Sequence, residues 1–185
     1  DKFAIAIGSH AGYKAEATGD GSIAIGMNAK STESRSLAVG RDSQATGQFA
    51  SAFGNNAFAT ADNAQAMGRG SRASATGSMA LGSGAVANVA DSVAIGAGSI
   101  ANRQIGVANA YLKTSEDSGS VWVSSHGAFS VGSSTVTRQI TGVAAGSEST
   151  DAVNVAQLRA LKSYSDATFS TASNTIFGEG TSNVI

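Results

Sequence analysis

The chain has 185 residues, a formal net charge of −1, no cysteine, no proline, 23 glycines and only 6% aromatic residues. So few large side chains cannot fill the core of an ordinary globular domain of this length, and they suit an extended fibre segment better. The lack of cysteine excludes a disulfide framework and thiol chemistry, and the absence of a basic stripe argues against nucleic acid as a partner.

A four-residue cassette, ending in alanine, an apolar residue and glycine, recurs seven times along the first half of the chain. After the first copy its glycines are all fourteen residues apart; they are Gly8, Gly26, Gly40, Gly54, Gly68, Gly82 and Gly96. Strict repetition at a short period indicates a solenoid, in which each repeat is one coil. The wider first interval leaves four extra residues near 9–12, where we expect a longer turn.

The columns of the repeat predict two strands per coil. With the cassette glycine as position 14, positions 3, 5, 10 and 12 hold small residues, whereas positions 11 and 13 hold mostly large apolar ones. Position 4 varies freely: Glu16, Lys30, Gln44, Phe58, Arg72, Val86 and Ile100. Such alternation is typical of strands, here pairing in parallel with their copies one coil along. The small columns then form a thin interior, and the bulky columns point outward.

The outward column at position 13 forms a continuous apolar stripe that is too large for the surface of a soluble monomer. Burial of each such side chain is worth about 1.5–3 kcal/mol, and ordering each residue of the backbone costs about 1–2 kcal/mol. Burial within a lone coil of alanine and glycine does not offset this cost of ordering the backbone. We therefore predict that the stripe is buried against other copies of the chain, through Ile25, Val39, Phe53, Met67, Leu81 and Ile95.

The regular spacing breaks after Gly96, since the next cassette glycine, Gly132, follows one coil and 22 residues later. The excess corresponds to residues 103–124. Residues 121–123 (VWV) have strand character and residues 116–119 (EDSG) have turn character, so we expect a hairpin that projects from the roll and folds back.

Aromatic area away from the apolar stripe is concentrated in this insertion and on the varied column. Because aromatic residues commonly anchor protein interfaces, Tyr111, Trp122 and Phe58 are candidate ligand contacts. The competing interpretation is that Trp122 packs the hairpin onto the base of the roll, since a lone tryptophan is buried on average.

Helical periodicity follows residue 150. Thr150 or Asp151 is the expected N-cap, and apolar or small residues then recur in three- and four-residue steps. The predicted coiled-coil positions are Val155, Leu158, Lys162, Ser165, Phe169, Ala172 and Ile176, and Leu161 offers a competing register. This pattern predicts a helix from Ala152 to about Asn174, ended by residues 177–180.

Catalytic chemistry finds little support in the sequence. The two histidines, His10 and His126, fall in expected surface turns and outside any spacing known for metal sites or catalytic triads. The glycine-rich cassettes contain no phosphate-binding fingerprint, and the fourteen-residue period differs from the six-residue period of left-handed β-helix acyltransferases. We therefore expect no enzyme activity, cofactor or metal.

The SVAIG cassette at this spacing, followed by residues 138–158 (RQITGVAAGSESTDAVNVAQL), resembles the head and neck of trimeric autotransporter adhesins with YadA-like heads. The resemblance implies a left-handed parallel β-roll, three chains around one axis, and a neck leading into a coiled-coil stalk. It gives an all-β head over residues 1–132 with a head insert, a neck over 133–158, and the start of the stalk over 159–185. Arg138 and Asp151 are then expected at subunit contacts of the neck.

The resemblance also implies a function. Such proteins stand on the bacterial cell surface, anchored in the outer membrane, and attach the bacterium to host cells or matrix proteins such as collagen or fibronectin. The chain shows no signal peptide and no membrane-spanning run and begins without methionine, so we expect a piece of a longer, membrane-anchored protein. The alternative function is a structural spacer that has no ligand of its own.

Overall fold

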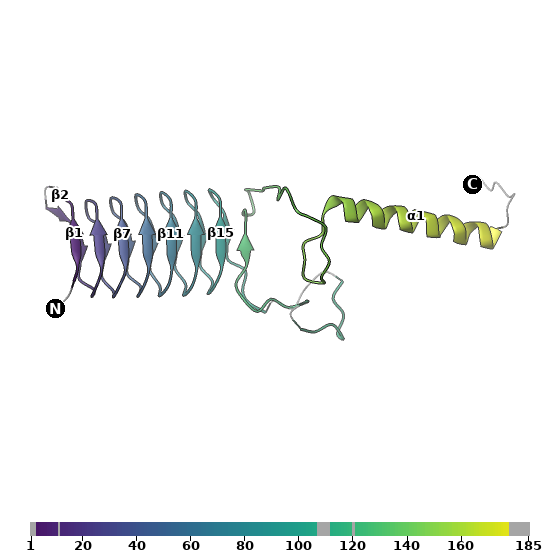
Figure 1. The fold of residues 1–185 in the computed structure, drawn as a ribbon, viewed down its shortest axis with the longest axis horizontal. Helices are drawn as coiled ribbons and strands as arrows, with labels where there is room; N and C mark the ends of the chain where they lie inside the picture. The colour runs from purple at the N-terminus through teal and green to yellow at the C-terminus, as the bar shows by residue number, and fades with distance from the viewer. Residues whose placement is uncertain (1–2, 11, 107–111, 120, 178–185) are drawn as a thin grey trace. The chain divides into compact units, whose positions relative to one another are not determined.

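The computed structural model describes the whole chain except residues 1–2, 11, 107–111, 120 and 178–185. It divides into two units, Asp1–Arg138 and Gln139–Ile185, which we call the roll unit and the helix unit. The roll unit is a parallel β-solenoid (Figure 1), and the helix unit is an irregular segment followed by helix α1 (Val155–Phe177).

Each regular coil adds one strand to each of two parallel sheets. We call the eight-stranded one the cassette sheet; it runs β1 (Ile5–Ile7), β5 (Ile23–Ile25), β7 (Leu37–Val39), β9 (Ser51–Phe53), β11 (Gln65–Met67), β13 (Met79–Leu81), β15 (Val93–Ile95), β17 (Phe129–Ser130). The seven-stranded second sheet runs β4 (Glu16–Ala17), β6 (Lys30–Ser31), β8 (Gln44–Ala45), β10 (Phe58–Ala59), β12 (Arg72–Ala73), β14 (Val86–Ala87), β16 (Ile100–Ala101). Cassette positions pair with their own copies, as in Ala38↔Ala52, which confirms the predicted fourteen-residue parallel coil.

The interior between the sheets admits only small side chains. The core consists of buried alanines, and the largest fully buried side chains are eight serines: Ser22, Ser31, Ser36, Ser43, Ser71, Ser78, Ser92 and Ser99. The predicted thin interior is therefore confirmed, and the bulky side chains of positions 11 and 13 have to point outward.

Two four-residue turns close each coil and give the flat roll two long edges. The N–H of Ala29 donates to Gly26 O (3.2 Å) in the turn of positions 14–3, and the N–H of Ser36 donates to Glu33 O (3.2 Å) in the turn of positions 7–10. The third residue of each turn has a positive φ, 57° at Asn28 and 55° at Arg35. We call the edge of positions 14–3 the first edge and that of positions 7–10 the second edge.

The lengthened first turn forms a small hairpin, in which β2 (Ser9–His10) pairs antiparallel with β3 (Tyr13–Lys14). The four extra residues therefore extend the turn, as expected, without breaking the stack, because β1 still pairs in register with β5.

The hairpin predicted over residues 103–124 is wrong for the part of this segment that the structure describes, 103–106, 112–119 and 121–124, which forms turns without strands. The N–H groups of Trp122 and Val123 both donate to Gly119 O, at 3.1 and 3.0 Å, so the VWV run closes a turn. A short β-prone run forms a strand only beside a partner, and here Gly119, with φ 81°, folds the chain back first.

The acidic turn of the insertion and the return to the roll agree with expectation. Asp117 N–H donates to Thr114 O (3.4 Å), and Asp117 Oδ2 accepts from the Thr114 N–H (2.7 Å). The roll resumes where Phe129 pairs with Val93, so the insertion lies between β16 and β17.

One buried hydroxyl gives a prediction on stability. Ser22 Oγ is fully buried and has no hydrogen-bond partner among the described residues, whereas Ser36 Oγ bonds to Ser31 Oγ and to Glu33 O, both at 2.6 Å. We expect Ser22→Ala to raise the free energy of unfolding by about 1 kcal/mol, because it removes an unpaired polar group. Ser36→Ala, the same change in the same column, should lower it by a similar amount. Circular dichroism during denaturant unfolding measures both, and equal effects of the two changes would contradict the argument.

Candidate assembly and binding surfaces

The outer face of the cassette sheet carries the apolar stripe that the sequence predicted. In the single chain, Ile25 and Phe53 are 37% exposed, Leu81 is 39% exposed and Met67 is 42% exposed. Val39 and Ile95 are half-buried. Register pairing of β5 through β15 places all six predicted residues in one ladder on this face. Ile7 extends the ladder at the start of the roll, 56% exposed.

The outer face of the second sheet changes character along the roll. At its start, Lys30 Nζ lies 3.8 Å from Glu16 Oε2. In its middle, the Arg72 guanidinium lies over the Phe58 ring, 4.6 Å from the centroid. Arg72 was not singled out from the sequence, although an arginine one period after an aromatic residue is a readable signal for this stacking.

The candidate ligand contacts do not form one cluster. Phe58 is half-buried on β10, and Trp122 is half-buried in the insertion that follows β16, three strands further along the second sheet. Tyr111 lies outside the described residues. Any ligand that uses Phe58 therefore meets it as part of an arginine–aromatic pair on a flat face.

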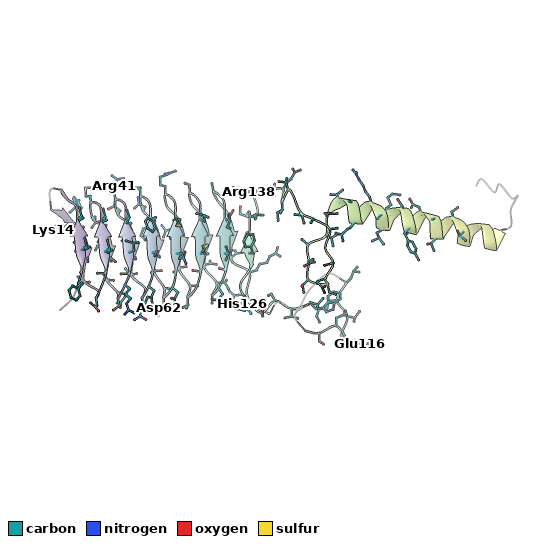
Figure 2. All side chains as sticks on the ribbon, in the orientation of Figure 1. Lys14, Arg41, Asp62, Glu116, His126 and Arg138 are labelled. Carbon is teal, nitrogen blue, oxygen red and sulfur yellow. The ribbon has the colours of Figure 1, made fainter. Side chains whose placement is uncertain are left out.

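Arg138 closes the end of the roll. In regular coils the N–H of position 2 donates to the carbonyl of position 1 one coil before, as Gly98 does to Ser83 O (2.9 Å). Among the described residues, no following coil supplies this donor to Ala97 O, and Arg138 Nη2 donates to it instead (2.6 Å). Arg138 Nη1 donates to Val131 O (2.6 Å) and to Ser99 Oγ (3.0 Å). Figure 2 labels this residue at the last coil.

Removal of this guanidinium should loosen the last coil. We expect Arg138→Met to destabilise the roll by about 1–2 kcal/mol, a modest loss because water can reach the freed carbonyls. Native-state hydrogen exchange should show faster exchange of the Gly96 and Gly98 amides. Their N–H groups donate to Leu81 O and Ser83 O of the preceding coil, beside the place where Arg138 binds. Arg103→Met, an arginine at the same end of the roll, is the matched control. Unchanged protection in Arg138→Met would show that the cap is unimportant.

A groove of about 620 Å³ opens at this end of the roll, lined among others by Ile100, Phe129, Val136 and Arg138. The long faces of the roll are sheets, so the groove belongs to the end of the roll, where the regular coils stop. The physical reason is that residues 132–138 leave the coil path after β17 and cross the end of the second sheet, where Ile100 N–H donates to Gly132 O (2.7 Å).

Asp151 organises a turn in the helix unit. Its Oδ2 accepts from the N–H groups of Ser147 (2.9 Å) and Glu148 (3.0 Å). The hydrogen bonds from Glu148 and Ser147 lower the pKa of Asp151 below its ordinary value. A lowered folded pKa means that this stabilisation is present above the ordinary pKa and is lost as pH falls through the folded one. Arg138 and Asp151 thus each bind backbone groups of their own unit.

The N-cap of α1 is Asn154, so the prediction of Thr150 or Asp151 is wrong. Asn154 Oδ1 accepts from the Gln157 N–H (3.0 Å), and Gln157 Oε1 accepts from the Asn154 N–H (3.2 Å), which is a capping box. Gln157 also makes two hydrogen bonds with Gly146. The Gly146 N–H donates to Gln157 Oε1 (3.1 Å), and Gln157 Nε2 donates to Gly146 O (2.9 Å). Asp151 was the wrong choice because its carboxylate closes the preceding turn; the N-x-x-Q spacing was the signal that identifies Asn154.

The large apolar side chains that the structure describes on helix α1 are uncovered in the single chain. Val155 (64%), Leu158 (61%) and Leu161 (63%) are all exposed, so both predicted registers remain open. Among the described residues, no helix has the length and apolar character needed to span a membrane. The same part of the chain holds no cluster of three or more potential metal ligands from His, Cys, Asp and Glu.

Comparison with known proteins identifies the repeat and the helix. The family model "YadA head domain repeat (2 copies)" matches residues 11–29, 31–57, 45–71, 59–85 and 73–99, and "Coiled stalk of trimeric autotransporter adhesin" matches residues 139–181. Autotransporter adhesin BadA of Bartonella henselae is 64% identical over 50 residues, which are 26% of this chain and 2% of BadA.

The fold has a solved relative. The crystal structure of the collagen-binding domain of the Yersinia adhesin YadA superposes with a TM-score of 0.54 at 28% identity. The match covers 88% of this chain and 99% of that one. The parallel roll of fourteen-residue coils, the head repeats and the stalk match agree, and the chain belongs to the YadA-like trimeric autotransporter adhesins, of which it is a head with its neck.

Proposed function

We propose that three copies of this chain assemble around one axis into an adhesin head that attaches a bacterium to host cells or extracellular matrix. The observation that carries the assembly is the apolar ladder on the cassette sheet, of which Phe53, Met67 and Leu81 are 37–42% exposed in the single chain. Burial of a continuous apolar face drives association. The family supplies the number three and the adhesive role.

In this proposal the head spans residues 1–132, the neck 133–158 and the start of the stalk 159–185. The full-length protein is anchored in the outer membrane of the bacterium, and this portion is extracellular. Arg138 holds the last coil and Asp151 holds the turn before the helix, and both stand near subunit contacts. The exposed Val155 and Leu158 would be covered by the other two helices of a stalk.

Recognition in such a head has to use broad surfaces, because the long faces of the roll are flat sheets. The second sheet is the face left free when the cassette sheet is buried. Its arginine–aromatic pair, Arg72 over Phe58, combines apolar area with a charge, as residues at protein interfaces commonly do.

Binding to immobilised matrix proteins tests the adhesive role. Collagen comes first, because the solved relative is a collagen-binding domain, with fibronectin and laminin beside it. We expect saturable binding of the trimer to at least one of them, and at least about tenfold weaker binding after Phe58→Ser. Val86→Ser, a change in the same column of the second sheet, is the control. A folded trimer that binds none of the three proteins would leave the spacer function.

The spacer alternative has an observation in its favour. Phe58 and Trp122 are both half-buried already in the single chain, so neither is a fully free anchor. A spacer would keep its trimer and its thermal stability after Phe58→Ser, and the bacterium would adhere equally well through a more distal domain.

A further inference from the structure

The formal net charge of −1 conceals a separation of charge across the roll. The first edge carries the cations Lys14, Arg41 and Arg69 and one anion, Asp42, at positions 1 and 2. Figure 2 shows Arg41 at this edge and Asp62 at the opposite one. The second edge carries four anions and one cation, Arg35, at positions 7–9; the anions are Asp20, Glu33, Asp62 and Asp91.

These edge charges are available to a partner. Lys14, Arg69 and the four anions of the second edge are exposed. Within the described part of the chain, Arg41 pairs with its neighbour Asp42 (3.4 Å), whereas Arg69 and Asp62 belong to no ion pair. Asp62 Oδ1 accepts from the Gln48 N–H (2.9 Å). Arg69 and Asp62 lie on opposite edges, so one chain cannot pair them with each other.

We propose that the basic first edge of one chain lies against the acidic second edge of the next chain, so that the two edges form the contact between neighbours. This inference rests on the proposed trimer. In a closed cyclic trimer each chain meets its two neighbours through two different patches, which have to complement each other. With the cassette sheet turned to the axis, the two long edges of a flat roll are the parts directed at the neighbours. Opposite charge on those edges steers the chains together and disfavours contact between two edges of the same charge.

Symmetry selects the pairs. Rotation about an axis parallel to the roll keeps every residue at its height along that axis. Arg69 follows Asp62 by seven residues, half of the fourteen-residue period. Coils stack about 4.8 Å apart, so Arg69 of one chain and Asp62 of the next differ by about 2.4 Å in height, within reach of the arginine side chain.

An anionic polymer on the first edge is the competing occupant. Its cations are sparse, however, since Lys14, Arg41 and Arg69 stand two coils apart, and Asp42 offsets one of them. A polymer ligand also gives no reason for the acidic second edge of similar length. A second copy of the chain accounts for both edges at once.

A charge-reversal cycle tests the contact. Arg69→Glu and Asp62→Lys alone should each weaken the trimer, with a dissociation constant at least about tenfold higher, because each places like charges together at three contacts. The double variant should recover most of that loss. The single variant Asp62→Lys and the double variant both lack the hydrogen bond from the Gln48 N–H to Asp62. Its loss therefore cancels when the coupling energy between the two changes is calculated. Arg72→Glu, which reverses a charge on the second sheet, should neither weaken the trimer nor rescue Asp62→Lys.

Sedimentation in low and high salt separates the two proposals. A native chain that sediments as a monomer in both overturns the trimer itself. A native trimer with additive effects of the two reversals overturns only the contact between the edges. Loss of heparin binding in Arg69→Glu with an unchanged trimer would assign the first edge to a polyanion and also overturns the inference.

Discussion

Leu81→Asp should convert the proposed trimer into folded monomers. Leu81 lies at position 13 of β13 and is 39% exposed in the single chain, so an aspartate there leaves the coil intact while the chain is alone. In the trimer, three carboxylates would meet near one dry axis. An unpaired charge buried in this way costs about 3–5 kcal/mol, and the variant introduces three of them.

Sedimentation equilibrium measures this result directly. The native chain should show about three times its mass of 18.2 kDa, and the variant should show the mass of one chain, with strand-rich circular dichroism retained. Val86→Asp is the matched control, because it puts the same charge in the next strand but on the second sheet. A Leu81→Asp protein that remains trimeric and melts like the native one would place the subunit interface elsewhere.

The roll was predictable because its period fixes which side chains point inward. Position 12 is alanine in each regular coil, and the structure buries Ala24, Ala38 and their copies completely. A fourteen-residue repeat leaves no freedom in register, since each strand pairs with its own copy. The same logic identified the outward stripe, although it cannot show what covers that stripe.

Local detail failed where the repeat stops. The VWV run of the insertion has strand propensity but no adjacent strand to complete, so a turn at Gly119 prevails. The predicted N-cap was too early, because the Asp151 carboxylate accepts hydrogen bonds from N–H groups of the preceding turn instead of from the helix. Asn154 is therefore the residue that caps the helix. Such competition between neighbouring hydrogen-bond partners is settled by backbone geometry.

The closure of the roll by Arg138 and the charge of its two edges were identified only from the structure. The acceptors of Arg138 lie 7, 39 and 41 residues away, at Val131, Ser99 and Ala97, and only the stacked coils bring them together. The edge charges stay hidden in the net charge because cations at positions 1 and 2 offset anions at positions 7–9. Once the turns are placed on opposite edges, the separation is visible from the sequence itself.

Gly54→Ala should be among the most damaging single substitutions in the roll. Gly54 has φ 128°, a conformation that residues with a side chain rarely adopt. A Cβ at this position would lie 2.7 Å from Gly68 O, a backbone atom of the next coil that cannot move without opening the ladder. Strain and overlap together should cost at least about 3 kcal/mol, enough to disrupt neighbouring coils.

Gly70→Ala separates the cost of steric overlap with the next coil from the cost of replacing a glycine at a positive φ. Gly70 also has a positive φ, 69°, but apart from its own chain neighbours no described residue has an atom within 4 Å of the position its Cβ would take. Its column holds Asn28 and Asn56 in other coils at φ 57° and 55°, so the backbone accepts a side chain here. We expect a cost of about 1 kcal/mol for alanine. Denaturant unfolding of both variants decides the matter, and similar losses at Gly54 and Gly70 would mean that the approach of adjacent coils does not require the cassette glycine.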